Sequence, residues 1–216
     1  MSRCRLLLGL LLLCGAVRAE PEAVFAHPLA PAQMSALLGT AARPLAAATG
    51  LRGRFEQRKY LPELPRPLLS TGEFLFARDV GVWWHTRTPF DSVFILTRDG
   101  ARSRDEGGGE TRIAAAEQPG VAVAARIFFA LFALDFEALA NDFETYGVPT
   151  GGGWQVGLRP KQAAMAAVFR EAVIDGAQHA QRIELQDTHG DRTEILLPEV
   201  DVLGGALTPA DRQRFD

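Results

Sequence analysis

Short alternating segments separated by strong turn signals run through most of this chain and limit how it can fold. From Leu51 to Lys59 small or apolar residues alternate with charged ones, which is the two-residue period of a β-strand with one polar face. Asp99-Gly100 and Asp175-Gly176 separate later segments, and such dipeptides are typical of hairpin turns. Consecutive strands joined by tight turns pair antiparallel. The pattern predicts a mostly β (α+β) fold on an antiparallel sheet, with strands at 51–59, 71–78, 80–88, 92–97, 143–148, 154–159, 168–174, 180–186 and 192–197.

Helices and loops are expected between these strands. Pro44 should break or kink the first helix, and Thr208-Pro209 has the N-cap and first-turn residues of a short C-terminal helix. Neither a repeat nor a linker indicates a second domain, so we expect one domain over residues 20–216. The helices are predicted at 33–49, 111–118 and 121–134, with 135–140 as an extension of the last, and loops at 61–67 and 104–109; residues 20–33 are predicted to be poorly ordered.

The segment from Val121 to Leu134 is apolar except for Arg126. A surface helix normally keeps one polar face, whereas this helix is apolar around most of its circumference. Seven large apolar side chains hidden from water represent on the order of 10–20 kcal/mol, so the helix cannot lie exposed. It is a buried core helix, a membrane-surface helix, or a lid between the sheet and a cavity. Because helices usually cover only one face of an antiparallel sheet, we favour the lid.

The N-terminus has the layout of a secretory signal peptide. Arg3 and Arg5 precede the apolar run Leu6 to Leu13, and Ala19 offers a cleavage site, so residues 1–19 are predicted to be a signal peptide. The run is shorter than the ~20 residues of a membrane-spanning helix. Lipoprotein anchoring at Cys14 remains an alternative. Cleavage after Ala19 removes both cysteines, Cys4 and Cys14, and leaves no thiol for a disulfide or a metal site.

Composition excludes some functions and leaves others open. The net charge of −3 provides no basic field for nucleic acid. Thirteen Phe against two Tyr favour a core or an apolar pocket, since Phe has no polar group to present to water. On composition alone, an ordinary large core is the favoured explanation of this imbalance.

Catalytic motifs are not found. The four histidines are His27, His85, His179 and His189, and neither H-E-x-x-H nor G-x-S-x-G occurs, so the usual patterns for a metalloprotease or a serine hydrolase are missing. His85 with Asp91 is the one conceivable catalytic pair, and a solvent-facing strand histidine is the simpler interpretation. We therefore expect no enzyme activity, no cofactor and no metal.

The region from Leu51 to Gly100 resembles the outer-membrane lipoprotein carrier family, LolA. The matching pieces are Gly53-Arg-Phe-Glu-Gln57, then Ser70 to Arg78 with its Gly-Glu-Phe, then Trp83-Trp-His-Thr-Arg-Thr-Pro89 and a strand ending at Asp99-Gly100. Downstream, Trp154 to Pro160 and the hairpins through Leu197 keep the family's order. Each motif is weak alone, and their order and spacing carry the resemblance.

The resemblance implies a strongly curved antiparallel sheet, an unclosed β-barrel, covered by a lid of short α-helices. It implies a monomer in the periplasm that binds the acyl chains of a lipoprotein or lipid and moves them toward the outer membrane. Its partners would be an inner-membrane release complex and an outer-membrane acceptor. Arg78 matches the family's arginine that hydrogen-bonds lid-helix backbone, and the lid would be Ile127 to Phe132. The cavity would be lined by Phe55, Phe74, Phe76, Trp84, Phe94, Leu96, Ile127, Phe128, Leu131 and Phe132.

Two departures indicate a divergent branch of that family. The Pro-rich loop at 61–67 is longer than in the familiar carrier, and the C-terminal part lacks the extra closing segment used with the receptor. The cargo is therefore either an acylated protein or a lipid-like molecule. A lipid-sensing regulatory module of envelope stress and a lipid-tailoring enzyme remain alternatives.

Overall fold

The structure, a computed structural model, describes residues 21–114, 127–167 and 169–216, and its main feature is one antiparallel sheet. The predicted signal peptide and residues 121–126 of the predicted helix lie outside these residues. The sheet has 11 strands in the order β6-β5-β4-β3-β2-β1-β11-β10-β9-β8-β7. The strands are β1 (Gly50–Tyr60), β2 (Leu68–Ala77), β3 (Gly81–Thr88), β4 (Ser92–Thr97), β5 (Gly100–Asp105), β6 (Glu110–Ala114), β7 (Phe143–Thr150), β8 (Gly153–Pro160), β9 (Phe169–Gly176), β10 (Ala180–Asp187) and β11 (Arg192–Leu203).

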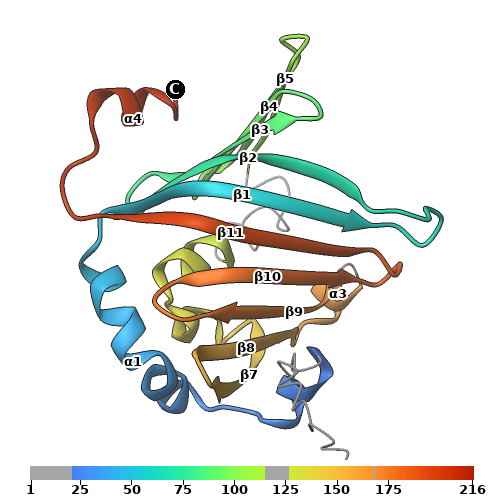
Figure 1. The fold of residues 1–216 in the computed structure, drawn as a ribbon, viewed down its shortest axis with the longest axis vertical. Helices are drawn as coiled ribbons and strands as arrows, with labels where there is room; N and C mark the ends of the chain where they lie inside the picture. The colour runs from blue at the N-terminus through green and yellow to red at the C-terminus, as the bar shows by residue number, and fades with distance from the viewer. Residues whose placement is uncertain (1–20, 115–126, 168) are drawn as a thin grey trace, which may run out of the picture.

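The sheet curves strongly but does not close (Figure 1). Within each half of the sheet, β1 to β6 and β7 to β11, neighbouring strands are also consecutive in the sequence. One long-range pairing, between β1 and β11, joins the two halves. The edge strands β6 and β7 do not pair with each other within the described residues. The predicted fold, a mostly β chain with an unclosed antiparallel sheet and short helices, is confirmed.

Most of the helices lie around the half of the sheet formed by β7 to β11, whereas α4 lies on the side of the other half, formed by β1 to β6 (Figure 1). A helix at residues 127–133, which we call the lid helix, is followed by the 3-10 helix η2, and α1 packs against η2. Not one helix in the described ranges is long and apolar enough to cross a bilayer. The helices are η1 (Pro21–Ala26), α1 (Pro31–Ala47), η2 (Phe136–Leu139), α3 (Ala163–Ala166) and α4 (Pro209–Gln213).

The two faces of the sheet carry two separate apolar clusters. The larger one joins the helix-covered, concave face to α1 and to the lid helix. The smaller one, Leu75, Trp83 and Ile95, lies on the opposite face and is covered by the C-terminal segment through Leu207 and Phe215. Successive side chains of a strand point to opposite faces, so Phe74 and Phe76 belong to the first cluster while Leu75 belongs to the second.

The N-terminal segment is ordered, contrary to the prediction for residues 20–33. Residues 21–26 form η1 and α1 already begins at Pro31. The backbone between them bonds to the edge of β7, where Leu29 N–H donates to Thr145 O at 2.8 Å and Gly147 N–H donates to His27 O at 3.0 Å. These bonds pair backbone groups at the edge of β7 that would otherwise be open. The composition of the segment does not reveal this pairing.

Two helix predictions are also wrong. Residues 111–114 belong to β6, which pairs with β5 from Gly100↔Ala114 to Arg104↔Glu110, and residues 115–118 lie outside the described ranges. Residues 135–140 do not extend the lid helix, because Leu134 adopts a left-handed φ of 51° and ends it. Pro44 lies inside α1 without ending that helix, whereas Thr208 caps α4 as predicted.

Candidate functional site

An apolar pocket of about 180 Å³ lies on the concave face of the sheet, beside the lid helix. Four of the ten predicted cavity residues line it, namely Trp84, Phe94, Leu96 and Phe128. The other lining residues are Gln57, Val82 and Ile195. Gln57 supplies the polar group in an otherwise apolar lining.

Strand register brings these side chains together. Val82 pairs with Leu96 and Trp84 pairs with Phe94 across β3 and β4, so two successive rows of the same face carry large apolar groups. Gln57 pairs with Ile195 across β1 and β11. The pocket is therefore built by strands from both halves of the sheet, which meet only because β1 pairs with β11.

A stacked aromatic cluster forms the floor beside the pocket. The Phe55 and Trp84 rings lie 3.8 Å apart between centroids, and Phe74 lies 5.9 Å from Trp84. Gly72 pairs with Phe55 across β1 and β2, and a Cβ at this position would lie 2.8 Å from the Phe55 ring. A glycine is thus needed here for Phe55 to lie flat against the sheet.

The lid helix packs on this floor through three phenylalanines. Phe132 stacks at 5.0 Å from Phe74 and 5.4 Å from Phe76. Phe129 meets Phe76 edge-on at 5.6 Å, and Phe128 lies 6.5 Å from Trp84. Phe132 is buried, whereas Phe128 and Phe129 remain half-buried. The helix therefore seals one part of the concave face and leaves the part next to Phe128 accessible.

The remaining predicted cavity residues lie in the packed interior rather than along the pocket. They share the large apolar cluster of the concave face, in which Ile127 is half-buried and the rest are buried; these residues are Phe55, Phe74, Phe76, Ile127, Leu131 and Phe132. These residues share the concave face with the residues that line the pocket, and only packing shows which part of that face is filled.

Arg78 contacts a helix, although not the one expected. Its Nε donates to Ala48 O at 3.0 Å and a terminal nitrogen donates to Leu45 O at 2.5 Å. Both carbonyls belong to the C-terminal end of α1, where backbone acceptors lack partners within the helix and a cation is favoured by the helix dipole. Within the described residues, the hydrogen bonds of the Arg78 guanidinium go to α1 rather than to the lid helix at 127–133.

Sequence reasoning missed Gln57, Val82 and Ile195. Val82 and Gln57 have the same parity as Trp84 and Phe55 in their strands, so the two-residue period could have placed them on the concave face. Ile195 could have been placed there only with the register of β11 against β1, since the two strands lie far apart in the sequence.

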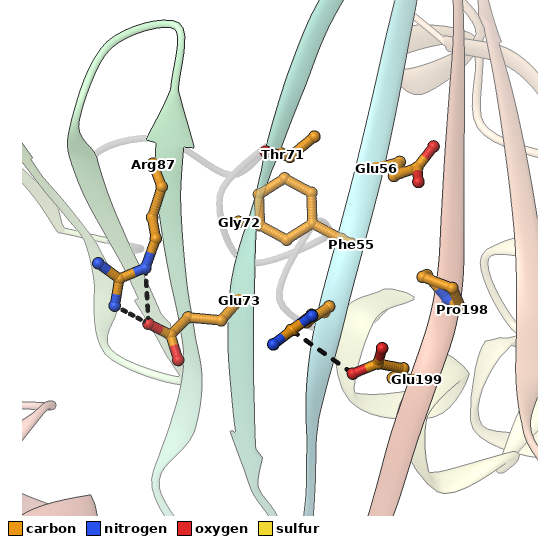
Figure 2. Close-up of a pocket in the computed structure, with 9 residues that line it drawn as sticks. Phe55, Glu56, Thr71, Gly72, Glu73, Arg87, Pro198 and Glu199 are labelled. Carbon is orange, nitrogen blue, oxygen red and sulfur yellow. Dashed lines mark hydrogen bonds and ion pairs between the residues drawn. The ribbon is translucent and has the colours of Figure 1, made fainter.

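A wider polar groove of about 600 Å³ lies on the opposite face, across β11, β1, β2 and β3 (Figure 2). Its charged groups pair with each other: Arg54 Nε lies 3.5 Å from Glu199 Oε2, and Arg87 bonds to Glu73. Burial raises the pKa of the Glu73 carboxyl, but the bond and charge of Arg87, with further help from Arg214 and His85, lower it below the usual value. A ligand in this groove would therefore meet Arg54, Glu199, Arg87 and Glu73 already paired with one another.

His85 also lies on this polar face, between two carboxylates. Its Nε2 lies 2.9 Å from Asp91 Oδ2 and its Nδ1 lies 3.7 Å from Glu73 Oε1. Only the contact of Nε2 with Asp91 has the length of a hydrogen bond. Among the described residues, no group of three or more His, Cys, Asp or Glu side chains could hold a metal ion.

The site is therefore a small apolar pocket between a curved sheet and a helical cover. No family model matches the sequence, and no curated protein matches it significantly.

A search of solved structures finds chains that are similar to this one over most of its length. A LolA superfamily protein, NE2245 from Nitrosomonas europaea, is similar over 81% of this chain and 96% of its own, at 8% identity and a TM-score of 0.43. A DUF1329 family protein from Desulfovibrio piger is similar over 81% of this chain and 95% of its own, at 9% identity and a TM-score of 0.41. The MucA/MucB complex of Pseudomonas aeruginosa is similar over 82% of this chain and 59% of that chain, at 13% identity and a TM-score of 0.42.

Proposed function

We propose that this protein binds the acyl chains of a lipoprotein or lipid on the concave face of its sheet and carries them through the periplasm toward the outer membrane. The observation that supports this most is the pocket itself. Apolar side chains of both halves of the sheet line it, and a half-buried Phe128 covers it. A packed domain has no need to leave such a space open.

The pocket is too small in this conformation for a complete acyl chain. Sites for drug-sized ligands have volumes of about 300–1,000 Å³, compared with about 180 Å³ here. Binding therefore requires the lid helix to move off Phe74 and Phe76, so that the ligand replaces its rings. The cost of opening is subtracted from the gross binding energy, which keeps affinity moderate and allows a carrier to release its load.

The first test is recovery of bound lipid. Protein purified from its native host should contain a lipid or lipoprotein that mass spectrometry identifies as unmodified. Delipidated protein mixed with acyl donors should bind them unchanged. Turnover of the donor would show a lipid-tailoring enzyme, and protein that neither contains nor takes up acyl chains would contradict the proposal.

A pair of variants tests whether the pocket is the binding site. Gln57→Glu places a carboxylate of nearly the same shape beside Val82 and Trp84, and ligand binding would then require an unpaired charge to be desolvated. We expect at least about 10-fold weaker binding of an apolar fluorescent probe, which corresponds to about 1.4 kcal/mol. Gln178→Glu, in the exposed turn before β10, is the matched control and should bind normally. Equal affinities of the two variants would place binding elsewhere.

A further inference from the structure

Arg98 lies in the turn between β4 and β5, at the end of the sheet that also carries Arg78. Thr97 fixes the turn, because its hydroxyl accepts from Asp99 N–H at 3.2 Å and donates to Gly100 O at 3.3 Å. The Arg98 guanidinium donates to Arg78 O at 3.5 Å. The Thr97 bonds thus hold the turn in place, and the Arg78 carbonyl holds one end of the Arg98 side chain.

The Arg98 guanidinium reaches the lid helix. Its central carbon lies 5.2 Å from the centroid of the Phe129 ring, which is within the range of a cation–π contact. Within the described part of the chain, Arg98 forms no ion pair with a carboxylate, and its guanidinium contacts the Arg78 carbonyl and this ring. Phe129 also packs edge-on against Phe76, and the next residue, Phe128, lines the pocket.

The alternative is an ordinary surface arginine whose side chain rests on a nearby ring. Two features favour a specific role. The contact joins a fixed turn of the sheet to the lid helix, and Phe129 is half-buried, so removing the cation exposes the ring that must lift when the pocket opens.

We propose that Arg98 clamps the lid helix shut through the Phe129 ring, while Arg78 fixes the end of α1. This inference rests on the proposed function, in which the lid helix must move for a ligand to enter. The two arginines divide between them the task that the sequence resemblance assigns to Arg78 alone. Because apparent affinity falls with the fraction of molecules that are closed, loss of the clamp should strengthen ligand binding.

The test compares Arg98→Gln with the wild type by two measurements. With 1-N-phenylnaphthylamine as the apolar probe, we expect Arg98→Gln to bind about two- to fivefold more tightly, as an exposed cation–π contact of ordinary strength allows. Without any ligand, backbone hydrogen exchange at 127–133 should be faster by a similar factor. Arg98→Lys keeps the cation and should remain near the wild type in both. Arg112→Gln, on the exposed edge strand β6, is the matched control and should change neither.

The Phe129→Leu background shows whether the effect passes through the ring. In that background Arg98→Gln should have no further effect on probe affinity or exchange. The clamp proposal is wrong if Arg98→Gln has its full effect in the Phe129→Leu background. It is also wrong if Arg98→Gln leaves hydrogen exchange at 127–133 unchanged, or if Arg98→Lys behaves like Arg98→Gln.

The two measurements also separate this inference from the proposed function. If the wild type does not bind the probe but Arg98→Gln still exchanges faster, the clamp stands and the apolar-ligand proposal fails. If the wild type binds and Arg98→Gln leaves exchange at 127–133 unchanged, the binding proposal stands and the clamp is wrong.

Discussion

At the scale of single residues, side chains at the turns decide how the helices are held. Arg78 follows β2 and bonds to two carbonyls at the end of α1, so it ties that helix to the sheet. The sequence resemblance indicated the chemistry of this contact, a guanidinium on helix backbone, but could not tell which helix receives it.

Replacing Arg78 tests the contribution of α1 to closure. Arg78→Leu should keep the fold, because the residue is only half-buried. It loses hydrogen bonds from a charged donor, worth about 1.5–3 kcal/mol when well formed. Opening becomes easier, so we expect up to about 10-fold tighter binding of acyl ligand and slower release, measured by transfer of labelled cargo to acceptor vesicles. Transfer at the wild-type rate would show that Arg78 has no part in release.

Leu134 ends the lid helix in a conformation that suits glycine. Its φ is 51°, and the bonds Asp135 N–H to Ala130 O at 2.8 Å and Leu134 N–H to Leu131 O at 3.3 Å form a Schellman motif. The left-handed region costs an L-residue about 1–2 kcal/mol, which burial of the leucine side chain offsets.

The left-handed conformation of Leu134 predicts that the usual order of stability of a glycine and an alanine variant is reversed at this position. Leu134→Ala and Leu134→Gly both lose a buried side chain, at about 2–5 kcal/mol, but the glycine relieves the backbone. We therefore expect Leu134→Gly to be as stable as Leu134→Ala or more stable in urea unfolding. At an ordinary helical position glycine is less stable than alanine by up to about 1 kcal/mol, and that order would contradict the left-handed cap.

At the scale of elements, the strands β9, β10 and β11 carry a charged cluster on the face away from the lid. Arg182 bonds to Glu194 at 2.8 Å and to Asp175 at 2.9 Å, and it also bonds to Glu184. Burial raises the pKa of Glu194, but the bond and charge of Arg182, together with Arg58 and Arg192, lower it below its usual value.

This cluster predicts loss of stability in acid. A carboxyl with a lowered pKa in the folded protein stabilises the fold above its unfolded pKa of about 4.3 and loses that contribution as pH falls toward the folded value. Glu194→Gln should therefore lower the free energy of unfolding by about 1–3 kcal/mol at pH 7, with a smaller difference at pH 3. Urea titrations at the two pH values measure this, and a penalty that does not shrink at pH 3 would show that the charge of Glu194 is not the cause.

At the scale of the whole molecule, binding requires the lid helix and the sheet to separate. Ala133 lies on the lid helix and Asp201 is exposed on β11, so spin labels at cysteines introduced there report the separation. We expect acyl ligand to lengthen or broaden the distance distribution in double electron–electron resonance. A second pair at Gln178 and Asp201, both on the sheet side, should not change. A lid distance that stays the same with ligand bound would mean that the pocket fills without opening.

The alternating segments and turn dipeptides determined most strands, because side-chain period and turn chemistry are local properties of the chain. The family resemblance, rather than the alternating pattern, pointed to Trp84, Phe94, Leu96 and Phe128, which border the pocket. Residues 111–114 and 21–33 were predicted wrongly: residues 111–114 pair with β5, and residues 27–29 bond to β7 between η1 and α1, and no local pattern reveals either pairing.

Only the tertiary structure decided which apolar residues line a space and which fill it. Phe74 and Phe132 have the same sequence character as Phe94 and Phe128, yet the first two stack in the interior while the last two border the pocket. The tertiary structure also decided that β1 pairs with β11, which brings Ile195 next to Gln57. It decided as well that Arg78 bonds to α1. The physical reason is that burial and cavity volume arise from how distant elements pack, whereas the sequence specifies directly only period, propensity and charge.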